Sequence, residues 1–353
     1  MIYTKLIKPI LFRFDPEHVH DAFVALGEKL GNFGVGRRVL SAVYGYRGRD
    51  ISKTVDGIRY KTPVLLSAGF DYNARLTRIL PSFSFGGVEV GSVTARPCTG
   101  NPRPRLTRLP RSQSIIVNKG LRNEGADRIL KRIAAKKREQ DFVIGISIAR
   151  TNDEQAAAAD EGIRDYVTTL QTFTKAGVGD YYTLNISCPN AFCGETFADP
   201  ALLQLLLKEI AAVPCRKPIY IKMPISISWD DFAELLSIAD RYGISGVVIG
   251  NLNKNYGALD FPEEAPKKYK GGLSGKPCFN PSNELIQKTR GRFGERFTII
   301  GCGGILSPED AMAKFNAGAD LIQLITGMIF YGPSLISRIC EAYVLRIHEK
   351  AVE

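Results

Sequence analysis

Short apolar runs alternate with longer amphipathic segments over most of the chain. Eight of these runs are rich in β-branched or aromatic residues and lack polar alternation, as expected of strands that are buried on both faces. They lie at 64–67, 87–90, 142–146, 181–186, 218–222, 246–249, 298–300 and 321–324. Because helix-like segments separate them, the pattern predicts a closed parallel (β/α)8 TIM barrel, preceded by a small hairpin strand at 55–60.

The first 45 residues follow a different pattern. Apolar residues recur at helical spacing through 2–11, and a second helix is expected from Pro16, capped by Asp15 and closed by Gly31. Two short amphipathic helices with interspersed Lys and Arg are therefore predicted. They suit either a helical hairpin that caps the barrel or a monotopic anchor on anionic lipid. We divide the chain into an N-terminal helical segment, 1–45, and an α/β barrel, 46–353.

The amino-acid composition excludes several classes of function. The formal charge is +11, and a basic surface suits nucleic acid, anionic lipid or acidic substrates. No block of five or six basic residues occurs, so nucleic-acid binding is not expected. No run of 18 apolar residues predicts a membrane-spanning helix. Seven cysteines without a CxxC pair, and three histidines, predict reduced thiols in the cytoplasm and no structural metal.

The segment Asn185-Ile186-Ser187-Cys188-Pro189-Asn190 directly follows an apolar run. In an α/β barrel the carboxyl ends of the strands form the catalytic face, so a thiol and two amides would lie there. An Asn/Ser/Pro cluster can also be a simple turn. Lys222 ends the fifth predicted strand among apolar neighbours, and we expect it to point into the same site.

Glycine-rich segments follow the last strands. The segments 301–305 and 325–328 come after the seventh and eighth strands, where α/β barrels commonly bind phosphate through free backbone N–H groups. A third glycine loop is expected at 271–275, after the sixth strand. The stretch 94–119 is rich in Pro, Arg and Gly and is long for a barrel loop, so we expect it to be functional or flexible.

Seven segments in fixed order resemble dihydroorotate dehydrogenase, the FMN-linked enzyme of pyrimidine synthesis. They are 67–71, 89–94, 100–105, 185–190, 271–275, 301–304 and 323–327, and the resemblance covers nearly the whole chain. The N-terminal Asp15-Pro16-Glu17 and His20 are similar to class 2, the membrane-associated branch that reduces quinone. In that branch the helix pair forms the mouth of a quinone tunnel.

The resemblance implies a role for individual residues. FMN would be bound by Ala68, Gly69, Ser92, Ser147, Asn185, Lys222, Gly250, Gly275, Gly303, Gly304, Ile325 and Thr326. Substrate would be bound by Asn118, Lys119, Gly120, Asn185, Asn190 and Asn251. Cys188 falls on the position of the catalytic base, and Cys193 is a rival thiol.

The implied reaction is FMN-dependent oxidation of dihydroorotate to orotate, with electrons passed to a membrane quinone. The protein would be peripheral, on the anionic cytoplasmic side of the inner membrane. Alternatives are a dihydroorotate dehydrogenase that uses fumarate or NAD, another FMN-dependent dihydropyrimidine-type oxidoreductase, and a non-redox barrel that binds a phosphorylated ligand.

The chain departs from the family pattern at several positions. Class 2 enzymes generally have serine as the base, whereas cysteine marks class 1. Tyr72 stands where the family has a lysine, and Val117 where it has an asparagine, with Asn118 one place away. Lys119 could supply the missing charge, unless it is only an exposed loop lysine. Ser147 replaces an asparagine beside the flavin.

Overall fold

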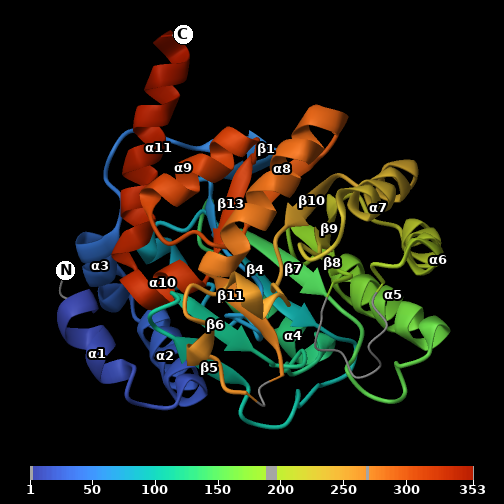
Figure 1. Cartoon of the computed structure of the whole chain (residues 1–353), viewed down its shortest axis with the longest axis horizontal. Coiled ribbons are helices and arrows are strands. Elements are labelled where there is room, and N and C mark those ends of the chain that lie inside the picture. Colours follow the sequence, from blue (N-terminus) through green and yellow to red (C-terminus); the bar gives the residue numbers. More distant parts are fainter. Residues whose placement is uncertain (1–2, 188–196, 268–269, 353) are drawn as a thin grey trace.

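Eight parallel strands close into a barrel, as the sequence predicts (Figure 1). The computed structural model describes residues 3–187, 197–267 and 270–352, so Cys188, Asn190 and Cys193 lie outside the described residues. Around the barrel the strands are β3 (Val64–Leu66), β4 (Gly87–Val93), β7 (Val143–Ile148), β8 (Tyr181–Asn185), β9 (Ile219–Met223), β10 (Gly246–Ile249), β12 (Thr298–Cys302) and β13 (Leu321–Leu324). Each lies on one of the eight predicted apolar runs.

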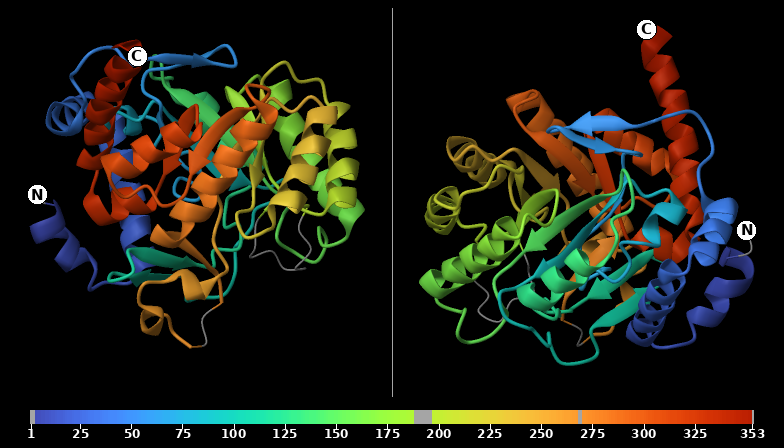
Figure 2. Two further views of the ribbon diagram at one scale, coloured as in Figure 1. Left: turned by 45° about the horizontal axis from the view of Figure 1, so that its top comes forward. Right: turned by 180° about the vertical axis from the view of Figure 1, so that it is seen from behind.

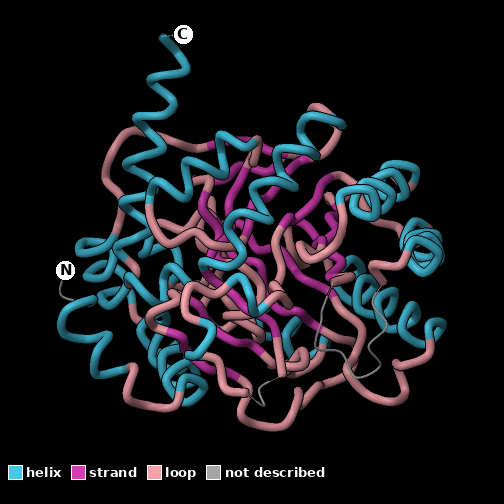
Figure 3. The backbone as a smooth tube through the Cα atoms, in the orientation of Figure 1, coloured by secondary structure: helices cyan, strands magenta, loops and turns pink. Residues whose placement is uncertain are grey.

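Helices surround the strands, as Figure 3 shows. They are α4 (Ala126–Ala135), α5 (Ala159–Lys175), α6 (Pro200–Ala211), α7 (Trp229–Arg241), α8 (Phe279–Phe293), α9 (Pro308–Ala317), α10 (Thr326–Tyr331) and α11 (Ser334–Val352). Short 3-10 turns are η2 (Leu80–Phe83), η3 (Tyr256–Ala258), η4 (Pro262–Glu264) and η5 (Lys276–Cys278). Side-chain caps at Asp199, Ser228 and Ser307 begin three of the helices by accepting from backbone N–H groups. These caps fix where the loops before α6, α7 and α9 end.

The barrel interior is packed at the end where the strands begin. Large side chains such as Tyr181 and Tyr220 fill it, and a hairpin of β1 (Lys53–Val55) and β2 (Ile58–Tyr60) packs against this end. Tyr220 donates to Asp56 in the hairpin turn, 2.6 Å away. The single hairpin strand predicted at 55–60 is therefore two paired strands. Since this end is filled, a site has room only at the carboxyl ends of the strands.

A separate three-stranded sheet covers that open end. It pairs β5 (Leu106–Leu109) with β6 (Ser114–Val117) and β6 with β11 (Gly272–Gly275). The sequence predicted a long loop at 94–119 and a glycine loop at 271–275. Both predictions were wrong where these segments form the strands β5, β6 and β11. Glycine suits β11 because a Cβ on Gly275 would lie 2.4 Å from the Gln113 carbonyl oxygen. Residues of this sheet, among them Leu106, Ile115 and Ser274, line one side of the cavity at the barrel mouth.

The N-terminal segment lies beside this sheet (Figure 2). It consists of the π-helix η1 (Tyr3–Ile7), α1 (Lys8–Leu11), α2 (Pro16–Asn32) and α3 (Gly34–Tyr44). Asp15 caps α2 by accepting from the His18 amide, 2.8 Å away. Two helices were predicted in this segment, and α3 was missed. Extended backbone at Phe33 separates α3 from α2, and it falls just past the predicted end at Gly31.

Large apolar side chains are exposed on these N-terminal helices. Ten of the thirteen exposed large hydrophobic residues found in the described chain lie in this segment: Leu6, Ile7, Ile10, Phe14, Phe23, Leu26, Phe33, Val35, Val39 and Val43. Among the described residues, no helix combines the length and the apolar character needed to cross a membrane. The N-terminal segment is thus the most apolar face of the described surface.

Candidate active site

A cavity of about 480 Å³ runs from the barrel mouth to the N-terminal helices. At the barrel end it is lined by Ala68, Gly69, Ser92, Asn185, Lys222 and Asn251. At the other end it is lined mainly by apolar side chains from the N-terminal segment, including Ile7, Leu11, Val19, Phe23 and Leu26. The cavity is therefore polar where the strands end and apolar where it meets the N-terminal helices.

A second cavity, of about 100 Å³, adjoins the polar end. Glycines line it: Gly250, Gly275, Gly303 and Gly304. It shares Ala68, Lys222, Asn251, Ile325 and Thr326 with the larger cavity. Gly304 has φ of +75°, and a Cβ there would lie 2.4 Å from Phe279 Cβ, so only glycine fits without a shift. A cavity walled by backbone in this way is suited to a phosphate group.

Hydrogen bonds fix the amides at the polar end. Asn185 donates from Nδ2 to Ser92 Oγ, 2.9 Å away, and Ser92 in turn contacts Ser147 Oγ at 2.8 Å. Ser147 does not itself line either cavity and is linked to the site through its contact with Ser92. Asn251 donates to Ser187 Oγ, 2.6 Å away. These bonds hold the amide groups of Asn185 and Asn251 in set orientations.

Lys222 brings a buried positive charge to the junction of the two cavities. Its side chain is 5% exposed, and Nζ donates to Ser67 Oγ at 3.3 Å. No carboxylate within the described ranges forms an ion pair with Lys222. A buried ammonium without an acidic partner is costly, and an anionic or electron-rich ligand beside it would offset that cost.

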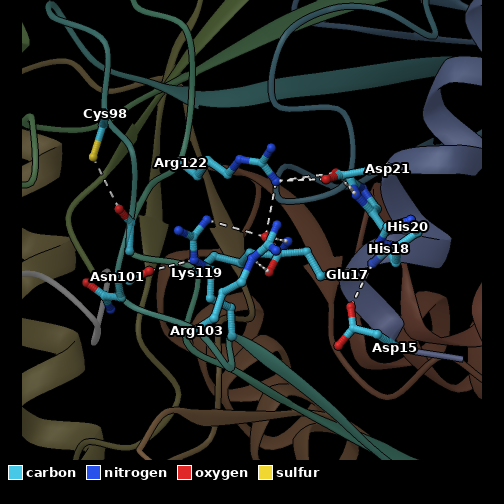
Figure 4. A network of polar contacts seen from close by, with 12 residues as sticks. Asp15, Glu17, His18, His20, Asp21, Cys98, Asn101, Arg103, Lys119 and Arg122 are labelled. Atoms are coloured by element: carbon cyan, nitrogen blue, oxygen red, sulfur yellow. Dashed lines mark hydrogen bonds and ion pairs between the residues drawn. The ribbon is translucent and has the colours of Figure 1, made fainter.

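One carboxylate from α2 gathers four cations beside the cavity (Figure 4). Glu17 is 3% exposed. It pairs with Arg103 at 3.2 Å, Arg105 at 3.3 Å, Lys119 at 3.1 Å and Arg122 at 3.1 Å. Burial opposes ionisation of Glu17, but Lys119 and the arginines outweigh it and hold the pKa of the carboxyl below its ordinary value. Glu17 thus ties the N-terminal segment to the loops of the barrel mouth.

Lys119 lies in the cavity wall and is 7% exposed, so the alternative of an exposed loop lysine is wrong. Its Nζ lies 5.3 Å from the ring centroid of Tyr72. Burial lowers the pKa of Lys119, and the neighbouring Glu17 partly restores it. Lys119 therefore places a cation next to the position at which the family pattern has its lysine.

Of the other predicted substrate residues, Gly120 lines the larger cavity, and Asn118 gives way there to its neighbour Val117. The side-chain oxygen of Asn118 instead accepts from Asn101 at 2.9 Å. Cys188 and Asn190 lie outside the described residues. Ser187, directly before them, donates to the Lys222 carbonyl at 3.0 Å, so the chain enters that segment at the cavity.

Arg108 was not among the predicted site residues. It lines the larger cavity and donates to the carbonyls of Phe14 and Leu11, at 2.9 and 3.3 Å. The sequence pattern that could have identified Arg108 is the two-residue period of a strand, which places Leu106 and Arg108 on the same face of β5. That signal has meaning only once 106–109 is known to be a strand.

Comparisons with known proteins agree with this geometry. The sequence model of the dihydroorotate dehydrogenase family matches residues 50–345. A protein named dihydroorotate dehydrogenase (quinone) from Chelativorans sp. (strain BNC1) is 34% identical over 346 residues, covering 96% of this chain and 90% of the relative. One of the same name from Salinispora arenicola (strain CNS-205) is 35% identical over 339 residues, covering 95% and 97%.

The fold has a counterpart of known structure. The crystal structure of ligand-free type DHODH from Eimeria tenella superposes with a TM-score of 0.79 and 25% identity, covering 96% of both chains. The chain therefore belongs to the dihydroorotate dehydrogenase family, a family of flavoenzymes.

Proposed function

We propose that this protein oxidises dihydroorotate to orotate with a bound FMN and passes the electrons to a membrane quinone. It is then an oxidoreductase acting on a CH–CH bond in pyrimidine synthesis, as the family and the quinone-named relatives support. The observation that carries the proposal is the shape of the larger cavity. Its polar end suits a pyrimidine and the flavin ring, and its apolar end suits a quinone.

The residues present fit FMN. The glycine-lined cavity between the loops after β12 and β13 would take the phosphate, with Gly303, Gly304 and Thr326 at its wall. Ala68, Gly69 and Ser92 would line the ring, and Lys222 would stand beside it as a cation. FMN supplies hydride acceptance from the substrate and electron transfer to the quinone. The protein supplies the fixed charge and donors that orient the two partners.

The substrate end requires donors, acceptors and a base. Amides suit a flat imide-rich ring because each donates and accepts, and Asn185 and Asn251 are already held by hydrogen bonds. Lys119 and Gly120 would meet the substrate carboxylate. Cys188 would take the proton from C5, since Ser187 brings the chain to the cavity immediately before it. Asn190 would complete the set of amides that hold the ring.

The apolar end would admit quinone from the membrane. The exposed apolar residues of the N-terminal helices, with lysines and arginines between them, would place the protein on an anionic surface at the cytoplasmic side of the inner membrane. In this proposal residues 1–45 form the membrane and tunnel segment, and residues 46–353 form the FMN-binding barrel. Burial of the apolar side chains in the lipid boundary would bring the tunnel mouth to the quinone pool.

Two residues of the cavity wall support an alternative substrate. Tyr72 and Val117 both line the cavity, at positions where the family pattern has a lysine and an asparagine. Another dihydropyrimidine is therefore the alternative substrate. The test is anaerobic mixing of the flavin-loaded protein with dihydroorotate and, separately, with dihydrouracil. We expect dihydroorotate to bleach the flavin and yield orotate; bleaching by dihydrouracil alone would overturn the assignment.

A further inference from the structure

A lysine outside the site described so far is buried without an acidic partner. Lys314, on α9, has an exposed fraction of 0%. Its Nζ donates to Ser282 Oγ at 3.0 Å and to Asn283 Oδ1 at 2.9 Å, and it lies 5.4 Å from the ring centroid of Phe279. In the part of the chain that the structure describes, no carboxylate forms an ion pair with it.

Such a charge is unfavourable by itself. Transfer of an ammonium from water to a protein interior costs several kcal/mol unless an opposite charge is near. Burial lowers the pKa of Lys314 to about 8, and the nearby groups that raise it are Cys302, Cys278 and Asp310. Two hydrogen bonds to neutral oxygens offset only part of the cost. The position therefore suits a cation whose counter-charge arrives with a ligand.

Lys314 lies directly behind the glycine loop that follows β12. Ser282, which accepts from Lys314, donates to the carbonyl of Cys302 at 2.6 Å. A Cβ on Gly301 would lie 3.2 Å from Lys314 Cδ. Phe279, whose ring lies by the ammonium, has its Cβ against Gly304. The ammonium and the small glycine-lined cavity are thus on opposite sides of one thin layer of backbone.

The small cavity itself holds few charges. Among the described residues that line it, Lys222 is the charged one, and we assign Lys222 to the flavin ring. A phosphate placed at Gly303 and Gly304 would face backbone N–H groups and the Thr326 hydroxyl of this cavity. Neutral donors would then face a phosphate group of about two negative charges.

We propose that Lys314 is a positioning residue for the cofactor phosphate, acting through the loop as a buried positive charge that the phosphate neutralises. The inference rests on the proposed FMN function and deepens it. Across one layer of backbone, in a medium of low dielectric constant, a charge acts strongly without contact. Lys314 thereby favours a phosphorylated flavin over the same flavin without its phosphate.

The competing explanation is structural, since Lys314 also links α9 to α8 through Ser282 and Asn283. The two explanations differ for riboflavin, which has the ring and ribityl chain of FMN but no phosphate. A structural lysine would affect both flavins alike. A lysine that acts on the phosphate would affect FMN alone.

The experiment uses the flavin-free protein and the variant Lys314→Met, titrated with FMN and with riboflavin by quenching of flavin fluorescence. We expect the FMN dissociation constant to rise at least about tenfold, while the riboflavin constant stays within about twofold. Thermal unfolding of the flavin-free variant should occur no lower than that of the wild type, because an unpaired buried charge has been removed. Lys288→Met, which removes an exposed lysine of α8 paired with Glu284, is the matched control and should change neither constant.

Other outcomes would overturn the inference. Equal weakening of both flavins, or an unchanged FMN constant, would refute an action on the phosphate. If both Lys314→Met and Lys314→Gln fail to fold, the lysine is structural, because the proposal requires the flavin-free protein to tolerate its loss. A wild type that binds riboflavin as tightly as FMN would instead refute the phosphate site of the proposed function.

Discussion

At the scale of single residues, the chemistry of the reaction depends on the thiol proposed as base. A free cysteine has a pKa of about 8.5, so a small fraction is thiolate near neutrality without a dedicated partner, whereas a serine hydroxyl has essentially none. Cys188→Ala should slow anaerobic flavin reduction by dihydroorotate at least ~100-fold while flavin binding survives. Cys188→Ser should retain some activity, with its pH profile displaced to higher pH. A wild-type rate in Cys188→Ala together with a slow Cys193→Ala would identify Cys193 as the base.

Substitution of Lys119 tests how the site binds the substrate carboxylate. A charge-assisted hydrogen bond contributes about 1.5–3 kcal/mol, so Lys119→Met should raise the orotate dissociation constant roughly 10- to 150-fold. The cationic form is the one that binds, and burial lowers the pKa of Lys119. Wild-type affinity should therefore fall as pH rises toward that lowered pKa, more steeply than in the variant. Titration of flavin absorbance by orotate measures both effects, and an unchanged constant would favour a different pyrimidine.

The location of a site residue was predictable from the sequence where the residue lies at the carboxyl end of a barrel strand. Asn185 and Lys222 lie at the cavity because Asn185 ends β8 and Lys222 is the next-to-last residue of β9. The partners of Lys119 were not predictable, because Glu17 is 102 residues away in sequence and joins it only through tertiary packing. Whether Asn118 or Val117 faces the cavity likewise depends on the pairing of β6, which a single sequence does not reveal.

At the scale of elements, α2 is joined to the barrel mouth by Glu17. Glu17→Gln leaves Arg105, Lys119 and Arg122 close together without their shared counter-charge. Removing one member of a buried ion pair typically costs about 3–5 kcal/mol, so urea unfolding should show a loss in that range. The depressed pKa of Glu17 means that its contribution is present above the unfolded pKa and is lost as pH falls.

Glu28 provides the matched control on the same helix. It pairs with Arg75 at 2.6 Å but is about a quarter exposed, so Glu28→Gln should cost about 1 kcal/mol or less. Equal losses in the two variants would contradict the role of Glu17 as the main link. Deleting residues 1–40 would remove the tunnel and this link together, so the single substitution is the cleaner experiment.

The eight barrel strands were predictable because burial on both faces leaves an unbroken apolar run. The sheet of β5, β6 and β11 was missed because polar residues interrupt β5 and glycines occupy β11. Both segments therefore have a low strand propensity. The third helix, α3, was missed because it begins at Gly34 without a capping side chain. Local signals thus identified the scaffold but not the wall of the site.

At the scale of the whole molecule, the apolar face of the N-terminal segment predicts membrane binding. Phe14, in this face, is 60% exposed, and Leu205, on α6, is 49% exposed. Phe14→Glu should reduce cosedimentation with vesicles that contain anionic lipid, because it places a charge in the lipid boundary. Leu205→Glu adds the same charge to a different face and should leave binding unchanged. Equal effects of the two substitutions would mean that the N-terminal helices are not the docking face.

The central claim is that one cavity joins dihydroorotate oxidation to quinone reduction. The most direct measurement is stopped-flow reoxidation of the protein after anaerobic reduction by dihydroorotate, with a short-chain quinone, fumarate and NAD tested in parallel. We predict rapid return of the oxidised flavin spectrum with the quinone, and slow or no return with the other two. Rapid reoxidation by fumarate or NAD, with the quinone inert, would contradict the account.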